Sequence, residues 1–502
     1  MSVPWKATLA ARTPPNGPHQ AKCDTVRSTD HENDVALRYQ NGATLSETRT
    51  GRVAHIDRER ELTVTSALSL PSNSSLTSSW PETPVGADPL PGQLDRWLAS
   101  RGAELVAVRR HIHAHPELSH QEFETAALVA RELKLAGLSP KMLPKGNGVI
   151  CDIGVGDRVI ALRADLDALP LPDTKDVPYR STVENVTHAC GHDVHTTVLL
   201  GTGLALAKLA ERNELPGRVR LLFQPAEENM PSGAPEVIAA GGLRDVAAIY
   251  ALHCAPLLPV GLVGVRSGPF TAAADKIEVR VTGRGGHTAR PHLTADLVYA
   301  IGRVVTDLPA ALSRLVDTRA ALNITFGAIE AGTVHNAIPT AAVARGTLRV
   351  LDRAVWGEAQ KLVERILEAT VAPYPQVSYR LDYQRGAPPV VNDEEATAVF
   401  ATAARTAIGD EAVLNAPQSM GGEDFSWYLE EIPGSMARLG VRIPGTDLDI
   451  HAASFDVDER SIAVGVRILV QTAMQALHHY GAAQPGGSRL RAVPPGRVGV
   501  GR

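Results

Sequence analysis

The chain has few cysteines for its length, and it lacks long apolar runs. Four cysteines occur among 502 residues, too few for the dense disulfide framework that stabilises small secreted domains. A membrane-spanning helix needs a run of roughly 20 apolar residues. The longest candidate, at 197–207, is followed directly by Lys208 and Glu211. We therefore expect no transmembrane helix and a reducing compartment.

Long basic blocks are also missing from the sequence. Lys and Arg number 50 against 55 Asp and Glu, which gives a formal net charge of −5. Such a balance argues against nucleic acid or an anionic membrane as a partner. The first thirty residues are polar and lack the continuous apolar segment of a secretory signal. The sequence therefore indicates a cytoplasmic protein.

The length predicts more than one folded part, because 502 residues exceed the usual size of a single hydrophobic core. Residues 1–88 show neither helical nor strand periodicity, and 70–92 are rich in Ser, Pro, Thr and Asn. We expect 1–88 to be a disordered N-terminal extension. The Gly-, Pro- and Arg-rich segment 483–502 predicts a flexible tail.

Between these ends, short apolar runs alternate with helical patterns. Ser119 and Glu122 match a capping box at the start of a helix, and Gly137 marks its expected end. Short continuous apolar runs are typical of strands buried on both faces of a largely parallel sheet. The predicted strands are 159–164, 218–224 and 247–253, and further helices are predicted at 94–115 and 194–211.

A different pattern begins near Asp275, where apolar residues alternate. The expected order is strand, helix, strand, strand, helix, strand, at 275–283, 295–308, 321–329, 341–351, 354–371 and 376–383. This order is that of a ferredoxin-like open-faced sandwich. We therefore predict an α/β fold with a mainly parallel-sheet domain at 89–273 and 389–482. A ferredoxin-like α+β domain is expected as an insertion at 274–388.

Side chains that bind metal ions gather where the buried strands end. Open α/β sheets bind their ligands at this edge, and thiolates, imidazoles and carboxylates hold Zn²⁺, Mn²⁺ and similar ions. The segments are His188-Ala-Cys-Gly-His-Asp-Val-His195, Gln224-Pro-Ala-Glu-Glu228, Ala251-Leu-His253 and Asp449-Ile-His451.

The adjacent Glu227 and Glu228 indicate two separate roles. Neighbouring side chains on an extended backbone diverge, so one carboxylate can bind metal while the other faces the substrate as a general base. Two like charges at the end of a buried strand would be costly without cations. Simpler interpretations stay open: Cys190 as a small buried side chain, the histidines as caps of the following helix, and the two glutamates as a solvated turn.

Taken in order, these strings resemble the M20 peptidase family, and in particular its amidohydrolase branch of hippurate hydrolases and auxin-conjugate hydrolases. The resemblance spans about residues 94–480. It implies that the parallel-sheet domain is a metallohydrolase domain and that the ferredoxin-like insertion is a lid or dimerisation domain. The strings that carry it are RHIHAHPELS at 110–119, ALRADLDALP at 161–170, HACGHDVH at 188–195, FQPAEE at 223–228, GRGGH at 283–287, HNAIP at 335–339 and MGGEDF at 420–425.

The resemblance implies a centre of two divalent metal ions, with Mn²⁺, Zn²⁺, Co²⁺ and Ni²⁺ as the candidates. It implies Glu227 as the catalytic base and Asp167 as a carboxylate that orients a ligand. Other branches have a histidine in place of Asp165, and here the Cys-Gly-His segment supplies the compensating donors. The implied metal ligands are Cys190, His192, Glu228, His253 and His451.

The resemblance also assigns roles to residues of the predicted lid. It implies His287 in both catalysis and substrate binding, and Asn336 and Arg349 in substrate binding. Arg349 could hold a substrate carboxylate through two hydrogen bonds, or it could be a surface charge at a strand edge. Related enzymes use such lid residues across a partner's active site. This implies a homodimer assembled through the lid, or a tetramer.

The resulting hypothesis is a metal-dependent hydrolase of the amide bond in N-acyl amino acids or related small amides. A metal-activated water would attack, Glu227 would act as general base, and His287 from a closing lid would stabilise the oxyanion. Two alternatives stay open. One is a dipeptidase or exopeptidase of the same fold, and the other is a non-catalytic metal-binding substrate sensor.

Overall fold

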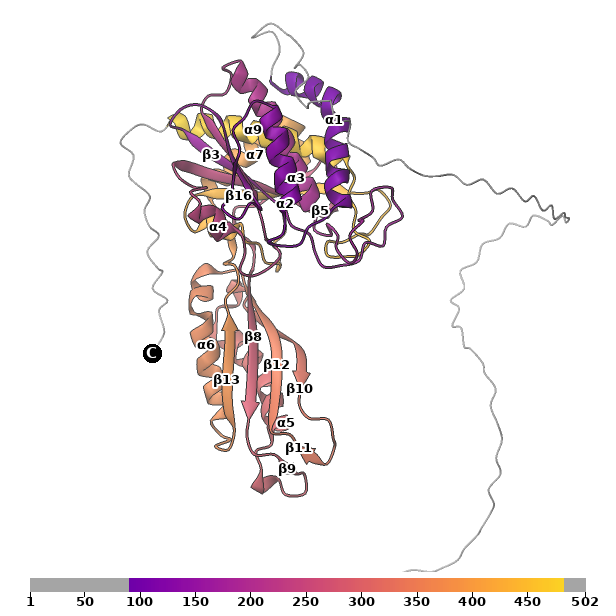
Figure 1. Cartoon of the computed structure of the whole chain (residues 1–502). Coiled ribbons are helices and arrows are strands. Elements are labelled where there is room, and N and C mark those ends of the chain that lie inside the picture. Colours follow the sequence, from indigo (N-terminus) through magenta and orange to yellow (C-terminus); the bar gives the residue numbers. More distant parts are fainter. Residues whose placement is uncertain (1–89, 483–502) are drawn as a thin grey trace, which may run out of the picture. The chain divides into compact units, whose positions relative to one another are not determined.

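The central element of the fold is an eight-stranded sheet. The computed structural model describes residues 90–482 (Figure 1), so the predicted extension and tail lie outside the described residues. The strand order is β1-β2-β4-β3-β5-β16-β6-β15. The four middle strands run parallel: β4 (Arg218–Gln224), β3 (Val159–Asp165), β5 (Val246–Pro259) and β16 (Gly434–Arg442). The outer strands are β1 (Lys141–Met142), β2 (Val149–Gly154), β6 (Val263–Val265) and β15 (Val413–Asn415). This confirms the predicted mainly parallel sheet.

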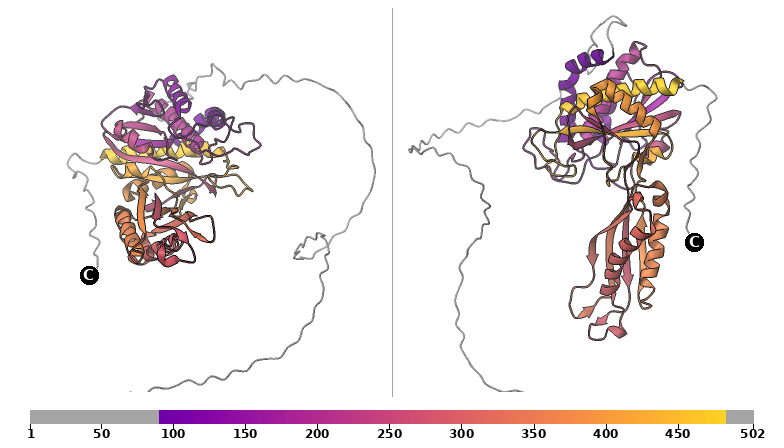
Figure 2. Two further views of the ribbon diagram at one scale, coloured as in Figure 1. Left: turned by 60° about the horizontal axis from the view of Figure 1, so that its bottom comes forward. Right: turned by 180° about the vertical axis from the view of Figure 1, so that it is seen from behind.

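Two apolar cores, one on each face of the sheet, explain why the central strands are apolar throughout. Ile160 and Leu162 of β3 pack into one core, and Val159 and Ala161 pack into the other. Burying each large aliphatic side chain contributes about 1.5–3 kcal/mol. The first core includes α1 (Leu90–Ala114), α2 (Phe123–Leu135), α3 (His192–Glu211), α7 (Glu394–Ile408) and α9 (Arg460–Ala482) (Figure 2), and the second includes α4 (Ala234–Ala239) and α8 (Ser426–Leu429). No helix within 90–482 is long and apolar enough to cross a membrane.

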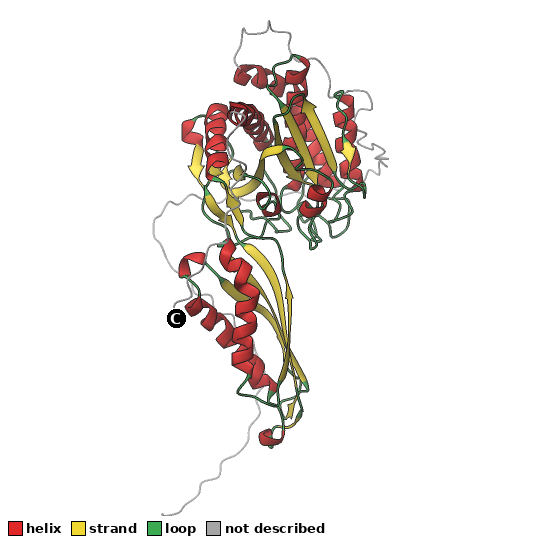
Figure 3. Cartoon of the chain, turned by 90° about the vertical axis from the view of Figure 1, so that its left-hand side faces the viewer, coloured by secondary structure: helices red, strands yellow, loops and turns green. Residues whose placement is uncertain are grey.

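A second, four-stranded sheet is inserted between two paired strands of the main domain. The chain leaves through β7 (Gly268–Thr271) and returns through β14 (Val390–Asn392), which pairs with β7 antiparallel. The inserted sheet has the antiparallel order β10-β12-β8-β13. Two helices lie along one face of it (Figure 3). Its elements are β8 (Ala273–Thr282), α5 (Leu297–Leu315), β10 (Asn323–Glu330), β12 (Ala341–Val350), α6 (Arg353–Val371) and β13 (Ser378–Gln384), with a small ribbon of β9 (Gly286–His287) and β11 (Ala337–Ile338).

The chain therefore contains the predicted ferredoxin-like order of strands and helices. On β8, buried positions alternate with more exposed ones along the strand. This is the pattern of a sheet that is covered on one face only. The predicted domain boundaries at 89, 274 and 389 stay predictions.

The predicted capping box is wrong, because hydrogen bonds to other groups occupy both of its side chains. The side chain of Glu122 does not cap α2. Its Oε1 instead accepts from the backbone N–H groups of His120 (2.9 Å) and Ala226 (2.7 Å). Ser119 donates to Oδ2 of Asp167 at 2.6 Å. The entry to α2 is thus bonded to the loops that follow β3 and β4, where the candidate site lies.

Candidate metal centre

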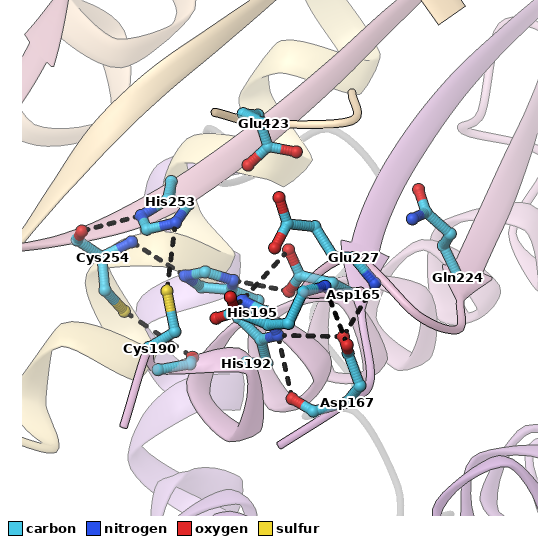
Figure 4. Close-up of polar contacts among 12 residues, drawn as sticks. Asp165, Asp167, Cys190, His192, His195, Gln224, Glu227, His253, Cys254 and Glu423 are labelled. Atoms are coloured by element: carbon cyan, nitrogen blue, oxygen red, sulfur yellow. Dashed lines mark hydrogen bonds and ion pairs between the residues drawn. The ribbon is translucent and has the colours of Figure 1, made fainter. Parts of the chain in front are cut away.

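The five predicted metal ligands come together at the carboxyl ends of the central strands. Each belongs to a group of three side chains whose donor atoms lie within 4.8 Å of one another. Figure 4 shows Cys190 and His253 pointing towards each other, with the side chains of His192 and Glu227 close by. The groups of predicted ligands are Cys190, His192 and His253, and Cys190, Glu228 and His451.

Hydrogen bonds leave specific donor atoms of these residues free for a cation. His192 Nδ1 donates to the backbone oxygen of Asp167 at 2.9 Å, while Nε2 is buried. Within 90–482, His192 Nε2 has no hydrogen-bond partner, and Glu228 Oε1 has only the nearby ring of His451, itself a predicted ligand. Leaving a buried polar atom unsatisfied costs about 1–3 kcal/mol. A divalent cation fits this arrangement, because it would satisfy both atoms.

His253 is oriented in the same way. Its Nδ1 lies 2.9 Å from the backbone oxygen of Cys254, to which it can donate, and its Nε2 lies 3.6 Å from Cys190 Sγ. His451 Nε2 lies 3.2 Å from Glu228 Oε1. A thiol, three imidazoles and a carboxylate therefore converge, and this is a donor set suited to Zn²⁺ and neighbouring transition metals.

His195 also lies near His192, but hydrogen bonds occupy both of its ring nitrogens. Its Nδ1 lies 2.7 Å from Asp165 Oδ1, and its Nε2 accepts from the backbone N–H of Cys254 at 2.8 Å. Asp165 is held in turn by Arg163, whose Nη1 donates to Oδ2 at 2.7 Å. His195 and Asp165 therefore link β3 to β5 beneath the centre, and we do not count them as ligands.

Asp167 fixes the backbone of the two glutamates as well as His192. Its Oδ1 accepts from the N–H of Glu227 at 3.1 Å and its Oδ2 from the N–H of Glu228 at 2.9 Å. Burial alone would raise the pKa of Asp167, but hydrogen bonds from His192 and Ser119 hold it below the ordinary value. The geometry agrees with the predicted role of Asp167 in orienting a ligand, which stays a prediction.

The carboxyl group of Glu227 faces two further acids that the sequence reasoning did not identify as part of the site. Carboxylate oxygens of Glu227, Glu423 and Asp424 lie within 4.8 Å of one another. Burial most strongly, then repulsion from Glu423 and Glu228, raises the pKa of Glu227 well above its ordinary value. Arg163 bonds Asp424 at 2.7 Å and Glu423 at 3.1 Å. The MGGEDF string contains both Glu423 and Asp424, but it was used only to recognise the resemblance to the family.

The three predicted lid residues lie outside the candidate ligand groups found in the described part of the chain. His287 is exposed, and its Nδ1 accepts from Ala289 N–H at 3.0 Å. Asn336 is exposed as well. Arg349 Nη1 donates to the backbone oxygen of Met420, in the string that also contains Glu423. The catalytic and substrate-binding roles of these three residues stay predictions.

A buried arginine holds the N-terminus of α3, where His192 lies. Arg109 of α1 donates to Asp193 at 2.7 Å and to Asp456 at 2.9 Å. His113, one turn later, lies 2.7 Å from the same oxygen of Asp193. Removing one partner from such a set of paired buried charges strongly destabilises a protein, because it leaves a buried charge uncompensated. The histidine-rich string at 110–119 therefore includes a support for the site rather than a set of ligands.

Gly233 packs against the loop that carries Glu227, and it has no room for a side chain. A Cβ atom at this position would lie 1.8 Å from the backbone oxygen of Pro225. We expect Gly233→Ala to lower the free energy of unfolding by about 1–3 kcal/mol and to reduce activity. Gly302→Ala is the matched control, because its Cβ would meet nothing within 4 Å in α5. That change should be neutral or stabilise by up to about 1 kcal/mol. Urea unfolding measures both, and equal effects would contradict this interpretation.

Glu122 gives the fold a specific pH dependence. Burial most strongly, then repulsion from Asp167, raises its pKa from 4.5 to about 7. The folded state therefore binds a proton at Glu122 more tightly than the unfolded state does. This proton stabilises the folded state to its full extent below pH 4.5, and the stabilisation is lost as the pH rises through 7. Across this pH window, we expect the free energy of unfolding of Glu122→Gln to rise relative to that of the wild type by up to about 3 kcal/mol. Urea unfolding at several pH values tests this, and parallel pH curves would contradict it.

Comparison with known proteins agrees with this geometry. Residues 161–475 match peptidase family M20/M25/M40. An N-acetyl-L-cysteine deacetylase of Bacillus subtilis is 36% identical over 382 residues, which are 76% of this chain and 90% of that protein. A solved structure from Bacillus subtilis, described as a dinuclear metal binding peptidase from the M20 family, is 33% identical with a TM-score of 0.66. It covers 76% of this chain and 99% of its own.

A relative from Rhodococcus jostii carries a different kind of name. It is named as a glutamate–cysteine ligase and is 48% identical over 370 residues, which are 73% of this chain but only 46% of that protein. Because the match spans less than half of that relative, its name does not carry over. The matched family, the relatives aligned over nearly their full length and the converging donor set agree with one another. The chain therefore belongs to peptidase family M20/M25/M40, in its branch of metal-dependent amidohydrolases.

Proposed function

We propose that this protein hydrolyses the amide bond of N-acyl amino acids or closely related small amides. The observation that carries the proposal is the position of Glu227, whose carboxylate lies within 4.8 Å of the candidate donor atoms of His192 and Glu228. A proton acceptor beside a divalent cation is the arrangement that metal-assisted hydrolysis requires. Similarity to a deacetylase named for an N-acetylated amino acid supports this substrate class.

The residues of the site suggest how the reaction proceeds. When bound, divalent cations make a water molecule a better nucleophile and polarise a carbonyl oxygen. Glu227 takes the proton of the water as its oxygen attacks the amide carbon. Glu227 keeps this proton until the C–N bond breaks. Glu227 then gives the proton to the departing amine.

The inserted domain would complete the site on the substrate side. His287 and Asn336 are exposed, so they are free to contact a substrate or the active site of a second copy. Arg349 would bind the carboxylate of the amino-acid portion with two hydrogen bonds. We propose a homodimer through this domain as the arrangement that brings these side chains to the centre. Mn²⁺, Zn²⁺, Co²⁺ and Ni²⁺ are the candidate ions.

A substrate screen tests the proposal. The full chain is assayed with N-acetyl and N-benzoyl amino acids beside dipeptides, each with added Mn²⁺, Zn²⁺, Co²⁺ or Ni²⁺ and each with EDTA. We expect hydrolysis of the N-acyl amino acids that EDTA abolishes and added metal restores. Faster turnover of dipeptides would favour an exopeptidase. Absence of turnover with every metal would overturn the proposal in favour of a binding protein.

A further inference from the structure

Arg438 places a positive charge beside the candidate metal centre. In the register of the central sheet, it pairs with His253 of β5 on one side and with Gly264 of β6 on the other. Side chains of paired residues project from the same face of a sheet. A Cβ atom on Gly264 would lie 3.5 Å from the Cβ of Arg438, as expected for one shared face. Arg438 therefore projects from the face that carries the predicted ligand His253.

The guanidinium of Arg438 is stacked but not bonded. Its Cζ lies 5.1 Å from the centroid of the Phe270 ring. Within residues 90–482 it forms neither a hydrogen bond nor an ion pair. The buried Arg109 and Arg163 differ, since three carboxylates bind each of them. Arg438 is only partly buried, so its N–H groups can be reached by a ligand.

The surroundings of Arg438 belong to the reaction site. Burial lowers the pKa of Arg438, and the nearby Glu423 and Cys190 raise it by less. If Arg438 only balanced these acids, an ion pair with one of them would serve that purpose, yet the described structure has none. An external anion is the partner that fits an unpaired guanidinium here.

We propose that Arg438 binds a carboxylate of the substrate, placed a short distance from the scissile amide. The inference rests on the proposed amide hydrolysis and narrows its substrate class. A guanidinium that stacks on an aromatic ring presents its N–H edge to a planar anion and can form two parallel hydrogen bonds. The carboxylate can belong to the acyl group or to the amino acid. Because Arg349 is proposed to hold the amino-acid carboxylate, the acyl group is the expected source.

Four substrates separate the two sources: N-acetyl-L-alaninamide, N-acetyl-L-alanine, N-succinyl-L-alaninamide and N-succinyl-L-alanine. The wild type should prefer the succinyl compounds. In Arg438→Met, kcat/KM for them should fall by about 10- to 100-fold, mainly through KM, with a much smaller loss for N-acetyl-L-alaninamide. The kcat/KM of Arg438→Lys for the succinyl compounds should lie between that of the wild type and that of Arg438→Met. Arg442→Met is the matched control, because Arg442 is an exposed arginine of the same strand.

Each outcome decides the matter. If kcat/KM instead falls most for the substrates with a free amino-acid carboxylate, Arg438 is still the anion site, but the carboxylate that it binds is that of the amino acid. Equal losses on all four substrates, or loss of metal from Arg438→Lys, would overturn the inference in favour of a structural role. Calorimetric binding of succinate adds a readout without turnover, and Arg438→Met should weaken it about tenfold or more. If no amide is hydrolysed but succinate binding still depends on Arg438, the proposed function fails and the anion site stands.

Discussion

Replacing Glu227 by glutamine should lower kcat for an N-acetyl amino acid by about two to four powers of ten, while the bound metal stays in place. Glutamine keeps nearly the same shape but cannot take a proton from water. The main-chain bond from residue 227 to Asp167 does not depend on the side chain, so the loop should keep its position. Initial rates and elemental analysis of the same preparation measure the two quantities together.

The control for this experiment is Glu184→Gln, which makes the same chemical change at an exposed position. It should leave both rate and metal content unchanged. Turnover of Glu227→Gln within about threefold of the wild type, well short of the expected loss, would show that another group accepts the proton. Glu423 would then be the next candidate, because its carboxylate shares the group of Glu227 and Asp424.

Substitution of His192 should remove bound metal, whereas substitution of its neighbour His195 should not. Both side chains are buried at the N-terminus of α3. Nε2 of His192 lacks a hydrogen-bond partner in the described structure, while Nε2 of His195 accepts from Cys254 N–H. We expect His192→Ala to retain fewer metal ions per chain after dialysis. Its kcat/KM should fall by at least about a hundredfold, because loss of a group that only supports a ligand already costs about 10- to 100-fold.

His195→Gln should instead act through stability. It removes a partner from the buried Asp165, although Arg163 still holds that carboxylate. The melting temperature should fall while the number of bound ions stays that of the wild type. Loss of metal from the His195 variant, with retention in the His192 variant, would reverse our assignment of the two histidines.

The parts of the fold that local pattern determines could be predicted from the sequence. The strand Arg218–Gln224 has the bounds that its apolar run predicts, because both of its faces pack into cores. The ferredoxin-like order of the inserted elements followed from a different pattern, the alternation of apolar residues that begins near Asp275. The capping box failed because Ser119 and Glu122 bond to groups far away in the sequence. A local motif gives no information about such partners.

The candidate site was predictable where residue type alone points to chemistry. Cys190, His192 and His253 could be named from their place at strand ends, and they do lie together. Residue type alone could not distinguish His192 from His195 as a ligand, since the difference lies in which ring nitrogen has a hydrogen bond. Only the resemblance to the family pointed to His192. Arg438 could not be recognised either. Its position beside His253 depends on the register between β16 and β5, which lie far apart in the chain.

The most direct test of the central claim is a crystal structure of the protein with bound manganese, with the ions located by anomalous scattering. We predict two ions at the carboxyl ends of the central strands. The ligands should be Cys190, His192, Glu228, His253 and His451, with the carboxylate of Glu227 beside the ions and not bound to them. Ions bound elsewhere, or none at these five side chains, would contradict the account.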